Sequence, residues 1–378
     1  MNRPSLRVLT ASWPGHKEPW RARFIRDLHL ELASNFDTEI VAPQIHSEDP
    51  LHEVDGPLKV HRFRYLSGGK SPRQGGMGWT SKFTWFKGMQ AKAQQWQPLS
   101  TPSMILAHWA VPAAAVARRT ARRLGCPYVV WCHGSDVHVY GRTFIGARVL
   151  RMGLSKATRI LVASEAMAKE LCDQHGFSNA QVLPVGIDAD FIESPRASLP
   201  DWPLKLLWVG ERIASKGYQR MLEAVQAAVD NGCSLSLEVI GEGPLERLHA
   251  GQEIDIRGAQ SPSEVRAAMD RSHLLLLPSH GEGTPLVVQE AMARGLAVAA
   301  TPVGGIPALF PQQEGWFRLA GNTDSEISES LTKLLMDLAG DPEILGRSRA
   351  ALFKRDMRDS SRQHCAGKLS KIVSEVLG

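Results

Sequence analysis

Two glutamates stand eight positions apart, on either side of a predicted helix start. Glu282 precedes Gly283, Thr284 and Pro285, and Glu290 lies in the apolar run that follows them. Threonine favours the N-cap, and proline favours the first helical position because its missing N–H would have no partner there. We therefore predict Thr284 as the N-cap and Pro285 as the first helical residue. Glu282 then lies just before the helix and Glu290 about two turns along it.

The first turn of this predicted helix has the features of an anion site. The N–H groups of Leu286 and Val287 have no partner within the helix, and the helix dipole adds positive potential there. Gly283 allows a ligand to approach the backbone closely. A diphosphate bound here would place a sugar beside Glu282 and a ribose diol beside Glu290, so the spacing predicts a sugar-nucleotide site. The alternative is that Glu290 faces solvent and Glu282 is a turn residue.

The chain around this site alternates strand-like and helix-like segments. The alternation runs through residues 6–176, breaks at the proline-rich segment 193–205, and restarts through residues 205–305. Such βαβ order indicates parallel doubly wound sheets, and the prolines predict a linker. Ligands of open α/β sheets bind at the carboxyl ends of the strands, where the Glu282 loop falls.

The predicted organisation is an α/β protein with two Rossmann-like domains facing across a cleft. We expect an N-terminal domain at residues 1–195 and a C-terminal domain at 196–360, which carries the predicted sugar-nucleotide site. A final helix is expected at 361–378. Asp188 and Asp190 form a D-x-D pattern, for which we expect a turn cap rather than a metal site, and no other pattern predicts a metal. The five cysteines are expected to be reduced thiols.

One segment resembles a known family signature. "PSHGEGTPLVVQEAMARGLAVAATPVGG", residues 278–305, resembles the E-x7-E motif of retaining glycosyltransferase family 4, which has the GT-B fold. The resemblance covers nearly the whole chain, because further elements of that family are matched by "VGERIASKGYQRMLEAV", "IGEGPLERL", "VLPVGID" and "AHWAVPAAAVARRTARRLGCPYVVWCHGSDV".

The resemblance implies roles for the donor-site residues. Lys216 falls on the donor-phosphate lysine, Glu282 on the glutamate that holds the donor sugar, and Glu290 on the one that holds the ribose. The family's arginine directly follows its glycine, whereas Glu211 fills that place here and Arg212 comes one position later. The remaining implied donor contacts are Gly210, Gly241, Gly283, Thr284, Leu286 and Val287.

The resemblance also implies that the domain at residues 1–195 binds the acceptor, that the domain at 196–360 binds the nucleotide sugar, and that the final helix, 361–378, packs back on the N-terminal domain. His133 falls on the histidine near the reacting anomeric carbon and joins Glu282 as a catalytic candidate. Gly15 and His16 match a loop that borders acceptor and phosphate. Ser135 and Asp136 are the remaining acceptor candidates.

The implied activity is transfer of a hexose, with retention of configuration, to an acceptor hydroxyl in polysaccharide or glycolipid biosynthesis. The donor would be a UDP-, GDP- or ADP-sugar, and no metal or other cofactor is expected. The alternatives are a nucleotide-sugar isomerase or phosphorylase of the same fold, and a catalytically silent scaffold that binds sugar nucleotides. The residues leave the donor's sugar and base, the acceptor, the linkage and the oligomeric state open. They also leave open whether Glu282 acts as a nucleophile in a double displacement or the reaction resembles an internal return.

Positive charge gathers in the first half. The formal net charge is +5, yet residues 56–135 contain no acidic residue. Aromatic residues are interleaved with lysines in "GWTSKFTWFKG", residues 78–88. We consider either a solvated basic face or a membrane-surface patch through residues 56–96; nucleic-acid binding is disfavoured because no recognition motif accompanies the charge. With no signal-like or membrane-spanning apolar run, we expect a protein that is either cytoplasmic or peripheral at the inner face of the membrane, with a lipid-linked or glycan acceptor.

Overall fold

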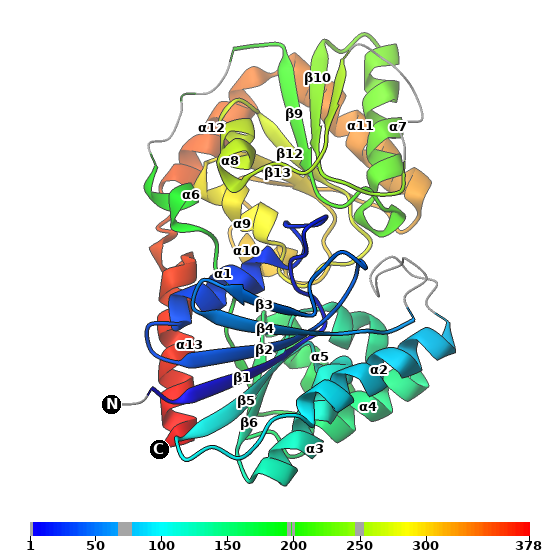
Figure 1. Cartoon of the computed structure of the whole chain (residues 1–378). Coiled ribbons are helices and arrows are strands. Elements are labelled where there is room, and N and C mark those ends of the chain that lie inside the picture. The colour runs from blue at the N-terminus through cyan, green and yellow to red at the C-terminus, as the bar shows by residue number, and fades with distance from the viewer. Residues whose placement is uncertain (1–2, 67–77, 195–197, 199–200, 246–252) are drawn as a thin grey trace. The chain divides into compact units, whose positions relative to one another are not determined.

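The computed structural model describes residues 3–66, 78–194, 198, 201–245 and 253–378, and Figure 1 follows the chain through them. It divides into two compact units: unit 1 combines residues 1–186 with 362–378, and unit 2 spans 187–361. The division falls closer to the N-terminus than the proline-rich segment that suggested a linker. Within the described part, no helix is both long and apolar enough to cross a bilayer.

Unit 1 is built on one large sheet. Its strands are β1 (Ser5–Thr10), β2 (Asp37–Pro43), β3 (His52–Asp55), β4 (Leu58–Phe63), β5 (Ser103–His108), β6 (Tyr128–Cys132), β7 (Arg159–Val162) and β8 (Ala180–Val182). Their order in the eight-stranded sheet is β3-β4-β2-β1-β5-β6-β7-β8. Neighbouring strands pair in parallel except β3 with β4, and central strands such as β1 are buried throughout.

The helices of unit 1 cover this sheet. They are α1 (Arg23–Leu32), α2 (Trp79–Ala93), α3 (Ala115–Leu124), α4 (Phe144–Leu154), α5 (Glu165–His175) and α13 (Arg362–Leu377). In α1, Ile25, Leu28 and Leu32 are buried in the core, and Phe24 is half-buried. The last helix, α13, lies against α1 and β5 (Figure 1). The Arg362 guanidinium lies 3.6 Å from the Asp27 carboxylate at this contact.

Unit 2 has a second parallel sheet. Its strands are β9 (Leu204–Val209), β10 (Leu235–Ile240), β11 (Ile254–Arg257), β12 (Leu274–Leu277), β13 (Ala297–Ala300) and β14 (Trp316–Arg318), in the order β11-β10-β9-β12-β13-β14. Its helices are α6 (Ala189–Glu193), α7 (Tyr218–Asp230), α8 (Pro262–Asp270), α9 (Leu286–Ala293), α10 (Ile306–Leu309), α11 (Asp324–Gly340) and α12 (Pro342–Phe353). The four leucines of β12 are buried at the centre of the sheet. The two parallel α/β units confirm the predicted fold class.

Several local predictions need correction. Helix α9 begins at Leu286 with Pro285 at its N-cap and no side-chain cap, so Thr284 is not the N-cap and Pro285 is not the first helical residue. The basic segment 56–96 contains β4 and α2, and its residues 67–77 lie outside the described part. By contrast, Asp188 caps α6 by accepting a hydrogen bond from the Asp190 N–H over 3.0 Å, as predicted.

Candidate functional site

Lys216 and Glu282 form an ion pair in unit 2. The Lys216 Nζ lies 2.8 Å from Glu282 Oε1 and 2.7 Å from Oε2. The buried Ser279 hydroxyl donates a third hydrogen bond to Glu282 Oε1 over 2.7 Å. The Glu282 side chain is 6% exposed and that of Lys216 is 32% exposed. The structure thus brings together two of the predicted donor residues and adds Ser279, which the sequence analysis missed.

Close backbone contacts hold the two loops that carry this pair. The Lys216 loop follows β9 and the Glu282 loop follows β12, and these strands are neighbours in the sheet. The His280 N–H donates to the Ser215 carbonyl over 2.9 Å. Gly217, with φ +73°, lies so close that a Cβ there would meet the Pro278 carbonyl oxygen at 1.9 Å. Only glycine fits this approach, which explains the Lys-Gly pair in the sequence.

A third loop, after β13, supports Glu282 from another side. The Thr301 hydroxyl donates to the Ser279 carbonyl over 2.5 Å, and the Gly305 N–H donates to the Gly283 carbonyl over 2.7 Å. Gly304 has φ +57°, and a Cβ there would lie 1.7 Å from the Glu282 carbonyl oxygen. The glycine loop that ends "TPVGG" is therefore a backbone support for Glu282, a role that its sequence did not reveal.

The start of α9 follows this support directly. Its first-turn N–H groups, which include those of Leu286 and Val287, have no partner inside the helix because of helix geometry. Thr284 lies half-buried in the turn before the helix. Glu290 is half-buried and lies one helical turn beyond the first residue. The helix start and the Lys216–Glu282 pair are thus contiguous in unit 2, which gives an anion-binding turn beside a cation and an acid.

Arg212 lies on the turn after β9. Its N–H donates to the Glu242 carbonyl over 2.7 Å, and its guanidinium lies 3.7 Å from the Glu242 carboxylate. Its buried Nε atom has no hydrogen-bond partner. Gly210 and Gly241 are in van der Waals contact across the same turn, since a Cβ on Gly241 would lie 1.8 Å from the Gly210 carbonyl oxygen. These two glycines bring the ends of β9 and β10 together and place Arg212 beside them.

His133 lies at the end of β6 in unit 1. Asp136 organises this loop: its buried carboxylate accepts hydrogen bonds from the N–H groups of Ala110, Gly134 and His133 at 2.7, 2.9 and 3.2 Å. Burial raises the pKa of Asp136, and the backbone donors act in the opposite direction. Asp136 is thus placed to hold the His-Gly loop, whereas Ser135 is exposed.

A chain of histidines leads from His133 into the core. His133 Nε2 lies 2.8 Å from His108 Nδ1, and His108 Nε2 lies 2.9 Å from His29 Nε2. His29 and His108 are fully buried, and burial lowers the pKa of His29 to about 3 and that of His108 well below its usual value. The sequence analysis missed both residues, because a histidine in an amphipathic helix or at a strand end carries no signal of its own.

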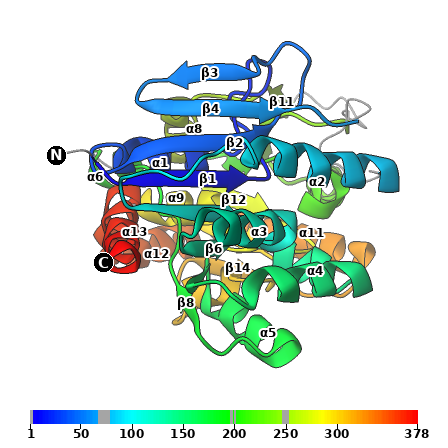
Figure 2. The ribbon, with the colours of Figure 1, turned by 60° about the horizontal axis from the view of Figure 1, so that its bottom comes forward.

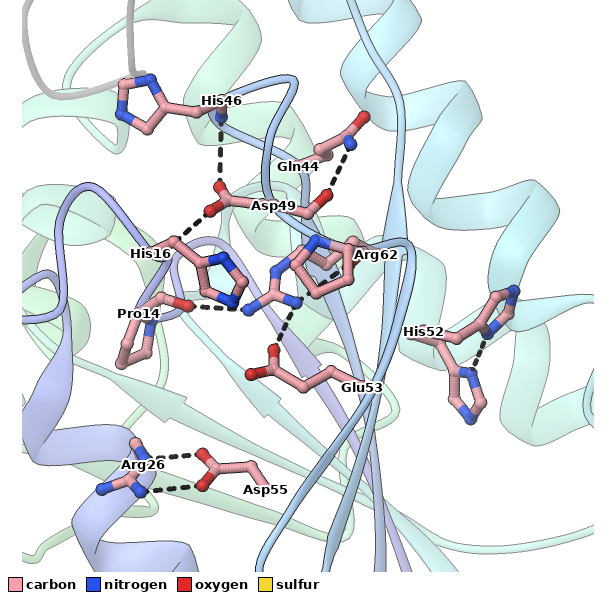
Figure 3. Close-up of polar contacts among 12 residues, drawn as sticks. Pro14, His16, Arg26, Gln44, His46, Asp49, His52, Glu53, Asp55 and Arg62 are labelled. Carbon is pink, nitrogen blue, oxygen red and sulfur yellow. Dashed lines mark hydrogen bonds and ion pairs between the residues drawn. The ribbon is translucent and has the colours of Figure 1, made fainter.

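The Gly15–His16 loop has a separate buried support, shown in Figure 3. Asp49, which is buried, accepts from the His16 N–H over 2.8 Å and from the His46 N–H over 3.2 Å. A Cβ on Gly15 would lie 2.5 Å from Asp49 Oδ1. The buried Arg62 guanidinium donates to the Pro14 carbonyl over 2.8 Å and pairs with Glu53 at 2.6 Å.

This support therefore sets the conformation of the predicted acceptor loop. Asp49 and Arg62 were not identified from the sequence, because neither belongs to a recognisable motif. Among the described residues, no group of three or more histidine, cysteine, aspartate or glutamate side chains has a metal-binding arrangement.

Two protein-family models match the chain. Residues 22–191 match the model described as Glycosyltransferase Family 4, and residues 203–337 match the one described as Glycosyl transferases group 1. A curated relative is the putative teichuronic acid biosynthesis glycosyltransferase TuaC of Bacillus subtilis (strain 168). It is 27% identical over 253 residues, which span 64% of this chain and 64% of that protein.

Two solved structures share the fold. Sucrose-phosphate synthase from Thermosynechococcus elongatus superposes with a TM-score of 0.72 at 15% identity, over 99% of both chains. Anabaena HepE in complex with UDP and glucose gives 0.69 at 14% identity, over 98% of this chain and 99% of that one. The two family models, both of glycosyltransferases, match most of the two units, and the shared architecture identifies the fold of this chain as GT-B.

Proposed function

We propose that this protein transfers a hexose from a nucleotide-diphosphate sugar to an acceptor hydroxyl with retention of configuration. The observation that carries the proposal is the Lys216–Glu282 pair, which is set directly before the N-terminus of α9. A cation, an acid and unpaired backbone donors meet at one turn, and this is the chemistry that a sugar diphosphate requires.

The donor would bind along this turn. The diphosphate would accept hydrogen bonds from the first-turn amides of α9, including those of Leu286 and Val287, and from Lys216. Arg212 would add a second cation. Glu282 would accept hydrogen bonds from sugar hydroxyls, and Glu290 from the ribose diol. HepE, which shares the fold, binds UDP and glucose in its solved structure, and this supports a sugar nucleotide as the donor class.

The chemical step breaks the bond between the anomeric carbon and the diphosphate oxygen. Lys216 and the helix amides stabilise the negative charge that develops on the departing diphosphate, a task that needs no protein nucleophile. The acceptor oxygen attacks from the same face, and the departing phosphate oxygen takes the acceptor proton. Glu282 is held by three hydrogen bonds from Lys216 and Ser279, which favours a binding role for its carboxylate over a nucleophilic one. His133 would orient a hydroxyl near the anomeric carbon.

The test is a panel of UDP-, GDP- and ADP-sugars supplied with a cell lipid extract, with products identified by mass spectrometry. NMR of the new glycosidic bond reports its configuration, and retention is the expected result. An isomerase would convert the donor without an acceptor, and a phosphorylase would need inorganic phosphate. A silent scaffold would be stabilised by a nucleotide sugar in a thermal-shift assay but would form no product. Any of these three outcomes would overturn the proposal.

We further propose a membrane-proximal acceptor, bound with the help of a surface on α2 and α4. Within unit 1, helix α3 packs against both α2 and α4 (Figure 2). Of the aromatic run in α2, Trp85 is buried in the core, whereas Phe83 is exposed with Lys87 over its ring at 5.5 Å. Phe144 and Ile145, in the first turn of α4, are 86% and 48% exposed. Exposed apolar side chains, together with a lysine beside Phe83, suit an anionic lipid surface.

Liposome co-sedimentation tests this second part of the proposal. Binding should require anionic lipid, and Phe144→Ser should weaken it. The matched control is Val54→Ser, which removes an exposed apolar side chain from β3, a different element of unit 1. Equal binding to neutral and anionic vesicles would remove the idea of a charged membrane surface without affecting the proposed chemistry.

A further inference from the structure

The chain His29–His108–His133 restricts where each imidazole proton can sit. His108 has two ring nitrogens, and each makes one hydrogen bond: Nδ1 to His133 Nε2 and Nε2 to His29 Nε2. A neutral imidazole carries one N–H and one lone pair. His108 therefore donates in one of these bonds and accepts in the other, so only two proton arrangements are consistent with the geometry.

The environment of His29 selects between the two arrangements. Its Nδ1 atom is buried and has no hydrogen-bond partner among the residues that the structure describes. In the first arrangement His133 donates to His108, and His108 donates to His29. His29 then accepts at Nε2 and must carry its own proton on Nδ1, which leaves a buried N–H without an acceptor. In the second arrangement His29 donates to His108, and His108 donates to His133. His29 Nδ1 then carries only a lone pair that lacks a donor. A buried N–H group without an acceptor is rarer than a buried lone pair without a donor, and it costs more free energy.

The second arrangement determines the chemistry of His133. His29 Nε2–H donates to His108, His108 Nδ1–H donates to His133 Nε2, and the His133 proton is on Nδ1. A doubly protonated His133 would also carry an N–H on Nε2. It would then have to donate to His108, and the direction of both hydrogen bonds would be reversed. Burial keeps His29 and His108 neutral, because it lowers the pKa of both groups. His133 thus keeps an N–H on Nδ1, while its only lone pair is already used.

The surrounding rings keep the His133 imidazole in this orientation. Its ring centroid lies 4.9 Å from that of Trp109, 5.2 Å from Trp131 and 5.7 Å from Phe24. Trp109 adopts a positive φ of 64° immediately after His108, and its N–H donates to the Trp131 carbonyl over 3.0 Å. The ends of β5 and β6 therefore hold the histidine chain and its aromatic neighbours together.

We infer that His29 and His108 are positioning residues that fix His133 as the Nδ1–H tautomer, a hydrogen-bond donor to a substrate hydroxyl and not a general base. The inference rests on the proposed function for the identity of that substrate. It also implies that the acceptor proton leaves by another route, which agrees with its transfer to the departing phosphate oxygen.

NMR of the full-length protein labelled with 15N-histidine tests the tautomers directly. Long-range proton–nitrogen correlations distinguish Nδ1–H from Nε2–H in a neutral ring. We expect Nδ1–H for His133 and His108 and Nε2–H for His29, with each ring assigned by its loss in a single variant. An Nε2–H tautomer at His133 would overturn the inference, whatever the activity of the protein.

Kinetics of two variant pairs supply the second readout. His108→Leu removes the donor to His133, whereas His108→Asn keeps an N–H near the Nδ1 position. We expect Leu to lower kcat by about 10–100-fold, the range found for hydrogen-bond partners that orient metal-ligating histidines, with an unchanged donor KM and substantial rescue by Asn. If His108→Leu does not fold, His29→Leu and His29→Gln test the next bond in the same way. Equal kcat values within each pair would contradict the inference.

The two readouts separate this inference from the proposed function. If the wild-type protein transfers no sugar yet the expected tautomers are present, the proposed function fails and the tautomer assignment stands. If the wild-type protein transfers hexose but His133 carries its proton on Nε2, the function stands and this inference fails.

Discussion

Lys216 Nζ lies within 2.8 Å of both carboxylate oxygens of Glu282, although 66 positions separate the two residues in the chain. The pair is only partly exposed, and Ser279 adds a third donor to the carboxylate. An acid held in this way is a poor nucleophile but a fixed acceptor for hydroxyl groups. A lysine held in this way is already fixed to the loop that precedes α9, so little reorganisation is needed when charge develops on a leaving group.

Removing the charge of Lys216 tests its role at the leaving group. We expect Lys216→Met to lower kcat by about 100- to 1,000-fold, as found when one donor to a developing anion is lost. The measurement is the initial rate of sugar transfer at saturating donor. The matched control is Lys169→Met, which breaks an exposed pair with Asp173 at 2.7 Å and should leave the rate unchanged. Equal rates for both variants would exclude a leaving-group role for Lys216.

Replacing Glu282 by glutamine tests the proposed contact with the donor sugar. The amide keeps the shape of the side chain but loses its charge and directs N–H groups toward donors such as Lys216 and Ser279. We expect a loss of about 100-fold or more in kcat/KM, because hydrogen bonds to a charged group are worth roughly 1.5–3 kcal/mol each. Competition by the free nucleoside diphosphate should change little, since that ligand lacks the sugar. A large loss of nucleotide affinity would contradict the assignment of Glu282 to the sugar.

A methyl group at Gly304 should disturb the Glu282 loop. Gly304→Ala places a Cβ 1.7 Å from the Glu282 carbonyl oxygen at a φ of +57°, so the loop must move and both activity and stability should fall. Gly346→Ala is the matched control, because this α12 residue has open space around it and alanine is the better helix former. The control should gain roughly 0.4–1 kcal/mol in the free energy of unfolding with normal turnover. Normal turnover in Gly304→Ala would show that the loop tolerates displacement.

The buried carboxylate of Asp49 should control the predicted acceptor loop. Each of its two oxygens accepts one backbone N–H, from His16 and from His46. Asp49→Asn satisfies only one of them and directs an NH2 group at the other. We expect a loss of roughly 1–3 kcal/mol in stability and a higher acceptor KM with an unchanged donor KM. Glu48→Gln, at an exposed neighbouring position, is the control. A change confined to donor KM would contradict an acceptor role for this loop.

The sequence predicted the parallel sheets well, because these depend on local patterns. The four buried leucines of β12 and the turn residues before α9 are readable without a structure. Helix α4 was missed because Gly146 and Gly153 lower its helix propensity. Gly153 is required by tertiary contact, since a Cβ there would lie 2.6 Å from the Ala114 Cβ.

The residues that support the candidate sites could not be predicted, because their roles do not depend on local sequence patterns. Ser279, Asp49 and His108 act through contacts with residues that are distant in the chain or through backbone groups, and no spacing rule encodes such contacts. Buried polar side chains in loops and at strand ends are thus the places where sequence reasoning failed, and in this protein they support the candidate functional residues.

The buried histidines make a prediction about acid stability. Burial lowers the pKa of His29 from 6.5 to about 3 and lowers that of His108 in the same direction, with smaller contributions from His133 and His29 to the latter. The unfolded chain therefore binds protons below pH 6.5 that the folded chain does not. The stabilising contribution is complete above pH 6.5 and is lost as the pH falls from 6.5 toward 3. Each group costs up to about 1.4 kcal/mol per pH unit in that window.

We expect unit 1 to lose about 3 kcal/mol of unfolding free energy between pH 7.5 and pH 5.5 through these two groups. Hydrogen exchange at amides of the buried strands β5 and β6 measures this free energy. The double variant His29→Gln/His108→Asn keeps donors at both positions but cannot titrate there, so its loss over the same interval should be smaller by about that amount. Carboxylates with lowered pKa, such as Glu18 and Glu39, titrate below this interval because their ordinary value is 4.5. Equal losses in the two proteins would mean that the buried imidazoles accept protons in the folded state, and the proton arrangement inferred for His133 would then lose its basis.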